Sequence, residues 1–229
     1  MLFRSGHEGV VKLFLERGDV DPNCPDVDDQ TPLVCAVVKG YERVVKLLLE
    51  RQDVDPNYPD QDEITSLGWA AINGHEGVVG LLLGRADVDP NRSYSCDQTP
   101  LGWAALHGHE GVVALFLERE DVDPNLPNKH GITPLWWAAI NGHEGATKLL
   151  LGRADVDPNC PDANGRTLLG CAAIRGHEGV VKLLLEQEGV DPDRPDKQGG
   201  TPRSYATERG HGGIVKLLQA RKSVRSTDV

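Results

Sequence analysis

Histidine and aspartate, two residue types that bind metal ions, recur along this chain at one fixed interval. His75, His109, His143, His177 and His211 are each 34 residues apart. Acidic pairs follow the same interval, at Asp53/Asp55, Asp87/Asp89, Asp121/Asp123 and Asp155/Asp157. Imidazole nitrogen is a ligand for zinc, and carboxylate oxygen is a ligand for calcium. Both series are therefore candidate metal sites.

Neither series meets the geometric conditions for binding a metal ion. Packed helices lie about 8–10 Å apart, whereas a Zn–N bond measures about 2.0–2.1 Å, so equivalent histidines of neighbouring units cannot share an ion. Calcium needs about six to eight converging oxygens, and the EF-hand spacing is absent. We expect the histidines to make local hydrogen bonds and the aspartates to accept from turn amides. A cation on the acidic edge is the alternative for the aspartates.

Catalytic patterns are also missing from the chain. The sequence has no Gly-rich phosphate loop and no nucleophile with a partnered base. Its five cysteines are an odd number without a paired framework. Cys35 and Cys171 occupy the repeat position that holds tryptophan in three other units, so we interpret them as small core residues. The sequence predicts a protein without enzymatic activity, cofactor or disulfides.

The 34-residue interval extends to residues that determine local structure. It separates Thr31, Thr65, Thr99, Thr133, Thr167 and Thr201, and an Asp-Pro pair recurs on the same interval from Asp21 to Pro192. A repeat of about 20 to 50 residues indicates a solenoid or an array. Each unit of such a fold contacts only its neighbours, which produces a long surface in place of a closed pocket.

Residues 128–161 illustrate what one unit must form. Thr133 is suited to cap a helix, Pro134 to occupy its first turn, and Gly142 to end it in a left-handed conformation. A second helix follows, with Leu149–Leu151 as its apolar part. The Asp-, Asn- and Pro-rich stretch from Asp155 onward favours a loop. Each unit is therefore predicted to hold two short antiparallel helices and a projecting loop.

The motif Thr-Pro-Leu-x-x-Ala-Ala-x-x-Gly-His, followed by a Val-Val-x-Leu-Leu-Leu run and Asp-Val-Asp-Pro-Asn, resembles the ankyrin repeat. Its Trp-Ala-Ala and Asp-Pro-Asn variants resemble ankyrin arrays of fungi. The period is one residue longer than the family's usual 33 or so. The tetratricopeptide repeat shares the period, but its two longer helices leave no room for the loop. The resemblance implies an all-α ankyrin solenoid.

The register of the repeat predicts one continuous domain over residues 1–229. A truncated unit spans 1–25, full units span 26–59, 60–93, 94–127, 128–161 and 162–195, and a capping unit with a tail spans 196–229. In the last unit, Arg203, Tyr205, Thr207 and Glu208 replace the usual apolar residues, as a polar cap requires. The truncated unit, which is not counted when the units are numbered, starts inside a helix at Met1 and lacks such a cap. This favours a fragment of a longer protein or weak self-association at this end.

The overall charge and hydrophobicity narrow the choice of partner and location. A net charge of −11 argues against nucleic acid, since phosphate binding needs clustered Lys and Arg. The sequence has neither an apolar run long enough to span a membrane nor the pattern of a signal peptide. We expect a cytoplasmic protein that binds another protein or a peptide.

Candidate binding residues are found by comparing the units with one another. The loop tip before each Thr and the pair before each Gly vary while the rest of the repeat stays constant, and in ankyrin proteins these positions form the concave recognition surface. Trp136 is added because the equivalent positions hold small residues or valine, so that its ring is available for stacking on a partner. The predicted partner-binding residues are Asp62, Ile64, Ile72, Asn73, Leu106, His107, Lys129, His130, Ile132, Trp136, Ile140, Asn141, Arg166, Ile174 and Arg175.

Two properties of this surface lead to a functional prediction. Ile72, Leu106, Ile140 and Ile174 form an apolar row that is either exposed for binding or half-buried between units. Acidic residues gather in the early loops and basic ones in the late loops, which predicts a bound segment with its basic part toward the N-terminal repeats. The sequence thus predicts a protein-recognition module. The alternatives are a self-associating scaffold and a sensor fragment of a larger protein that resembles fungal NOD-like signalling ATPases.

Overall fold

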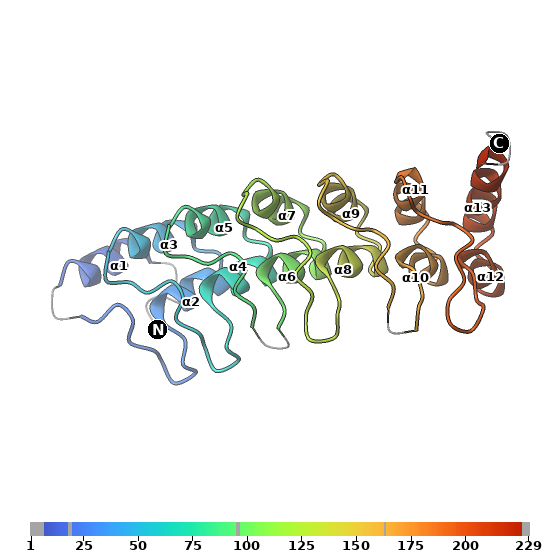
Figure 1. The fold of residues 1–229 in the computed structure, drawn as a ribbon. Helices are drawn as coiled ribbons and strands as arrows, with labels where there is room; N and C mark the ends of the chain where they lie inside the picture. The colour runs from blue at the N-terminus through green and yellow to red at the C-terminus, as the bar shows by residue number, and fades with distance from the viewer. Residues whose placement is uncertain (1–6, 18–19, 95–96, 163, 226–229) are drawn as a thin grey trace.

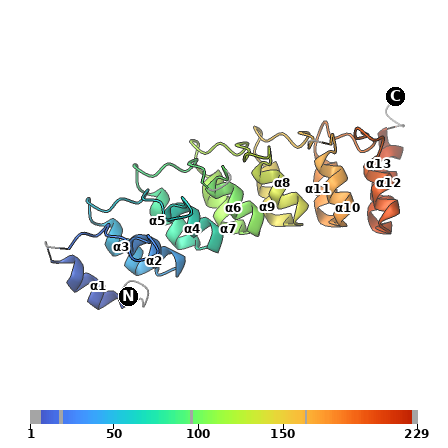
Figure 2. The same cartoon turned by 90° about the horizontal axis from the view of Figure 1, so that it is seen from below.

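The computed structural model describes residues 7–17, 20–94, 97–162 and 164–225, and within these ranges all regular structure is helical. The helices form two layers, with the hairpin loops projecting beside the layer of first helices (Figure 1). The units follow one another in a gently curved array, and the two ends of the chain lie at opposite ends of it (Figure 2). None of the helices in these ranges is long and apolar enough to cross a membrane.

Each layer contains one helix from each unit. The first helices are α2 (Pro32–Val38), α4 (Ser66–Asn73), α6 (Pro100–His107), α8 (Pro134–Ile140), α10 (Leu168–Arg175) and α12 (Pro202–Glu208). The second helices are α1 (Glu8–Leu15), α3 (Glu42–Leu49), α5 (Glu76–Leu83), α7 (Glu110–Leu117), α9 (Glu144–Leu151), α11 (Glu178–Glu186) and α13 (Gly212–Arg225). Every first helix packs on the first helix of the next unit and on the second helix of its own.

The start of each first helix is set by its threonine, as the sequence predicts. In α6, Thr99 has an extended backbone, and its hydroxyl oxygen accepts a hydrogen bond from the amide of Gly102 at 3.1 Å. This satisfies one of the amides that a helix leaves unpaired at its N-terminus. Gly108 ends α6 with φ at 72°, in the left-handed region that favours glycine.

The histidines join neighbouring units through contacts with backbone oxygens. His143 Nε2 lies 3.0 Å from the backbone oxygen of Leu106, in the preceding unit. Its ring also packs so closely on Gly108 that an added Cβ would lie 2.4 Å from Nδ1. The same contact recurs at His75, His109, His177 and His211. Glycine at this position therefore permits both the left-handed turn and the approach of the next unit.

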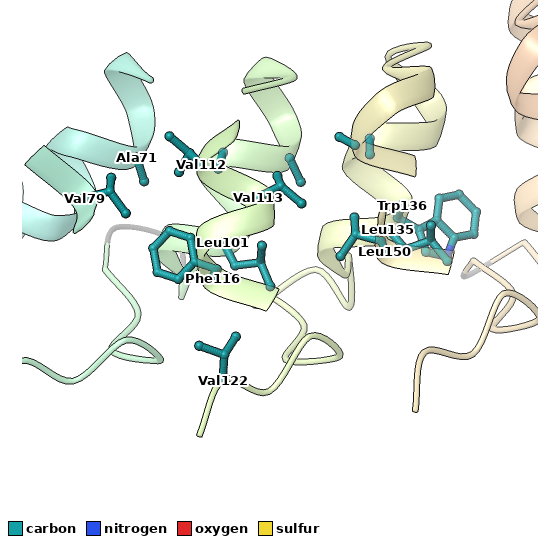
Figure 3. Packing of buried hydrophobic residues seen from close by; sticks show 14 of the residues in the cluster. Ala71, Val79, Leu101, Val112, Val113, Phe116, Val122, Leu135, Trp136 and Leu150 are labelled. Carbon is teal, nitrogen blue, oxygen red and sulfur yellow. The ribbon is translucent and has the colours of Figure 1, made fainter. Parts of the chain in front are cut away.

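One apolar core runs through the stack between the two layers. In the central units, the α6 residue Leu101 and the α7 residues Val112, Val113 and Phe116 are no more than 1% exposed (Figure 3). Cys35 and Cys171 are buried, as expected, whereas Cys96 lies outside the described residues. Because the core is continuous across units, the stability of each unit depends on its neighbours.

The aspartate pairs are used within the loops. Asp121 accepts a bidentate pair of hydrogen bonds from Arg119 at 2.8 and 2.6 Å, and Asp123 accepts one from the amide of Asn125 at 2.9 Å. Asn91 of the preceding loop donates to the backbone oxygen of Asp121 at 2.6 Å. The expectation that aspartates accept hydrogen bonds from turn amides is confirmed. The first aspartate of each pair instead forms an ion pair with an arginine two residues before it. The described residues hold no cluster of metal-binding side chains.

Candidate functional site

A carboxylate or amide five residues before the capping threonine holds each hairpin in shape, with one exception. In the second unit, Asp60 Oδ1 accepts from the amides of Asp62 and Ile64, both at 3.0 Å. Asn128 makes the same pair of bonds in the fourth unit, to His130 at 2.9 Å and Ile132 at 3.0 Å. The hairpin tips are thus fixed by their own side chains and present their exposed residues in a defined position.

The exception is Tyr94 in the third unit, where the other units have Asp or Asn. The second oxygen of Asp60 accepts from the indole N–H of Trp69 at 2.6 Å. The Tyr94 side chain extends to the preceding unit, where its hydroxyl oxygen accepts a hydrogen bond from the hydroxyl of Thr65 at 2.6 Å. Consequently the equivalent indole N–H of Trp103 is buried without a hydrogen-bond partner among the described residues.

Gln98 joins the third and fourth hairpins, a role that comparison of the repeats did not predict. Its side chain is 4% exposed. Its Oε1 accepts from Asn128 Nδ2 at 3.0 Å and from the indole N–H of Trp137 at 3.1 Å. The sequence did contain one indication of this role, because Gln98 is a polar residue at the repeat position that holds Ile64 and Ile132 in the flanking units.

Most of the predicted binding residues lie on the face formed by the first helices and the hairpins, which we call the inner face. Exposed members of the set are Asp62, Asn73, His107, Lys129, His130, Asn141 and Arg175. The members of the apolar row, Ile72, Leu106, Ile140 and Ile174, are half-buried. Ile132 and Arg166 are half-buried as well. The exposed polar residues therefore alternate with partly accessible apolar ones along this face.

Two predicted binding residues are placed differently. Ile64 is only 6% exposed and packs against Gly68, so it is a core residue. Trp136 is 8% exposed, and its indole N–H donates to the backbone oxygen of Cys160 at 3.2 Å. The expectation that the Trp136 ring stands free for stacking is wrong, because the ring is buried (Figure 3) and bonded to the loop that leads into the fifth hairpin.

Seven of the predicted residues nevertheless meet around one cavity of about 540 Å³ between α8, α10 and the two adjoining hairpins. We call it the α8–α10 cavity. Its volume is that of a small-ligand pocket. It is lined by His130, Gly131, Ile132, Trp136, Ile140, Pro161, Asp162, Arg166, Cys171, Ile174 and Arg175.

The polar groups of the cavity divide into a paired set and an unpaired one. Asp162 binds Arg166 through Nε at 2.8 Å and Nη2 at 2.7 Å. Burial opposes ionisation of Asp162, but hydrogen bonds from Arg166 and from backbone amides outweigh it and hold the pKa of the carboxyl below its ordinary value. Burial raises the pKa of the Cys171 thiol to about 11, so the thiol is protonated at neutral pH. Arg175 has no carboxylate partner among the described residues.

His107 lies on the inner face, and its surroundings favour the neutral form of its ring. Partial burial, and then the nearby His109 and His143, lower the pKa of its ring. The ring stacks on Trp103 with a centroid distance of 6.1 Å. The lowered pKa favours an uncharged planar group at this position over a cation.

Charge on the inner face changes sign along the stack. Asp29, Glu63 and Asp97 stand on the first three hairpins with φ between 53° and 62°, where the last three hairpins have glycine. Exposed arginines gather at the other end, at Arg175, Arg203 and Arg209. The predicted gradient from acidic to basic is thus present on one face.

Comparison with known proteins agrees with this architecture. The family model described as ankyrin repeats in three copies matches residues 2–94, 67–162 and 146–228. The chain belongs to the ankyrin repeat family. The crystal structure of EF0377, an ankyrin repeat protein, superposes with a TM-score of 0.74 at 28% identity, covering 82% of this chain and 96% of that one. No curated protein matches the sequence.

Membership of the ankyrin family confirms the predicted fold and decides against the tetratricopeptide alternative. Ankyrin repeats are generally protein–protein interaction modules and typically have no enzymatic activity. The seven- and eight-residue first helices of this chain are as short as the loop-rich repeat requires.

Proposed function

We propose that this protein is a non-enzymatic recognition module that binds a segment of another protein along its inner face. The observation that carries the proposal is the α8–α10 cavity, which is lined by seven of the fifteen predicted binding residues. The exposed thiols of Cys24 and Cys160 favour a cytoplasmic location, where they stay reduced.

The charge gradient supports one orientation of the bound segment. Its basic part lies toward the acidic hairpins that carry Asp62 and Glu63, and its acidic part lies toward Arg175 and Arg209. Complementary charge of this kind speeds encounter and sets direction more than it adds affinity.

The test is capture of partners from an extract of the source cells by the parent and by two variants. The inner-face variant carries Asn73→Glu, His107→Glu and Asn141→Glu, all at exposed positions. The control carries Gln52→Glu, Ala86→Glu and Ala154→Glu, exposed positions in the loops after the second helices, where the third unit already has Glu120. Both variants change the net charge equally.

We expect the inner-face variant to lose partners that the control retains, with the interaction then measured on purified components. Equal capture by both variants contradicts the proposal.

Self-association is a second candidate because α1 leaves apolar side chains exposed. Val10 and Leu13 are 42% and 67% exposed. Exposed apolar residues that cluster on one helix mark a possible contact surface. Sedimentation at several concentrations tests this candidate: an increase in mass that Leu13→Glu abolishes supports it, and a constant monomer mass contradicts it. Met1, on which the prediction of an uncapped first repeat depends, lies outside the described residues.

A further inference from the structure

The α8–α10 cavity has the character of a site for one apolar side chain. Trp136, Ile140, Ile174 and Pro161 contribute apolar surface to it. Its volume of about 540 Å³ exceeds what a buried water or a methyl group occupies. An aromatic side chain buries about 150–250 Å² and is the usual anchor in such a pocket.

In the second and third units, hairpin side chains occupy the space beside the first helix at the repeat position of Trp136. Trp136 stands at the repeat position of Gly68 and Gly102. Atoms of Tyr94 lie 2.8 Å from where a Cβ of Gly68 would be, and atoms of Gln98 lie 2.2 Å from the same point at Gly102. In the fourth unit the Trp136 side chain itself fills this position and forms one wall of the cavity, and Asp162 stands at the repeat position of Tyr94.

The uncompensated charge beside the cavity is positive. Asp162 and Arg166 form an ion pair and neutralise each other. Arg175 is exposed at the end of α10 and has no carboxylate partner within the described part of the chain. An apolar ligand group that carried a carboxylate next to it would therefore complement both parts of the site.

We propose that the α8–α10 cavity binds an aromatic side chain of a partner peptide whose following residue is acidic, and that Arg175 pairs with that acidic residue. This inference rests on the proposed function and specifies the ligand of its central pocket. The partner segment then runs with its acidic residue toward the basic C-terminal repeats.

The experiment titrates the whole chain with blocked dipeptides and follows it by NMR. The probes are N-acetylated, C-amidated Phe-Glu, Phe-Gln, Phe-Lys and Ala-Glu. The reporters are the indole N–H of Trp136 and the methyl groups of Ile140 and Ile174. We expect Phe-Glu to shift these signals, Phe-Gln to bind roughly two- to five-fold more weakly, Phe-Lys to bind still more weakly, and Ala-Glu to cause no shift.

Two matched variants assign the charge preference. Arg175→Asn introduces the residue that the chain has at the same position in Asn73 and Asn141, and Arg209→Asn makes the same change one unit further along. The first variant is expected to bind Phe-Glu and Phe-Gln equally, and the second to keep the preference of the parent.

The proposal is overturned if Phe-Glu leaves the cavity signals unchanged, if Phe-Lys binds as well as Phe-Glu, or if Arg175→Asn keeps the preference. The capture experiment changes Asn73, His107 and Asn141, none of which lines the cavity. Failure of the dipeptides alongside successful capture therefore refutes the cavity ligand and leaves the proposed function intact.

Discussion

The indole N–H of Trp136 donates a hydrogen bond to the backbone oxygen of Cys160 at 3.2 Å. The bond ties the first helix of the fourth unit to the loop that leads into the fifth hairpin. It also turns one edge of the ring toward the core and leaves part of the ring as a wall of the α8–α10 cavity. Trp136 is thus both a structural residue and a lining residue.

Replacing Trp136 by phenylalanine tests this structural part. Trp136→Phe keeps an aromatic ring but removes the donor and leaves the Cys160 carbonyl without it. We expect a loss of about 0.5–1.5 kcal/mol in the free energy of unfolding from the hydrogen bond, in addition to the packing lost with the smaller ring. Urea unfolding followed by circular dichroism measures it. An unchanged midpoint would show that the bond contributes nothing.

The tryptophans of the second and third units form a matched pair for the hairpin bond. Trp69 donates to Asp60, whereas the N–H of Trp103 has no partner in the described structure. Both changes to phenylalanine lose similar packing. Trp69→Phe also loses a bond to a carboxylate, so we expect it to destabilise more than Trp103→Phe by about 1.5–3 kcal/mol in urea unfolding. Equal effects would contradict the hairpin role of Asp60.

Two glycines of the repeat should respond oppositely to alanine. Gly80 lies within α5, with nothing within 4 Å of an added Cβ, so we expect Gly80→Ala to stabilise by about 0.5–1 kcal/mol. Gly108 has φ at 72° and would place its Cβ against His143, so Gly108→Ala should destabilise by at least about 1 kcal/mol. Thermal unfolding of both variants measures the difference. A stabilised Gly108→Ala would mean that the histidine contact is unimportant.

The four arginine–aspartate ion pairs of the loops lead us to expect that the folded state loses stability in acid. Hydrogen bonds from Arg51, Arg85, Arg119 and Arg153 hold the pKa values of their aspartate partners below the ordinary value. A carboxyl with a lowered pKa stabilises the fold fully above its unfolded pKa of about 3.9, and this contribution is lost as the pH falls through the lowered value.

Changing all four partners, Asp53, Asp87, Asp121 and Asp155, to Asn tests this pH dependence. The variant should be less stable than the parent at pH 7, and the two unfolding free energies should converge as the pH falls through the lowered pKa values of the four aspartates. Urea midpoints between pH 2 and 7 measure the convergence. Parallel curves over the whole range would show that the ion pairs do not link stability to pH.

The sequence alone predicted the fold, because the signals that set it are local and are repeated. A threonine whose hydroxyl caps a helix, and a glycine that accepts a left-handed turn, act within a few residues of themselves, as Thr99 and Gly108 do. The histidines make hydrogen bonds, as expected, although their partner, the carbonyl oxygen one unit back, is seen only in the structure.

Tertiary packing decided which variable positions are accessible. Ile64 and Ile132 occupy the same position of the repeat, yet Ile64 is buried beside Gly68 and Tyr94 while Ile132 lines a cavity. The difference comes from side chains of other units, since Tyr94 covers the space beside Ile64, whereas the smaller Asp162 stands at the equivalent position beside Ile132. Sequence comparison finds where the repeat varies, but burial depends on neighbours that lie about one repeat away, and only the stacked structure brings them together.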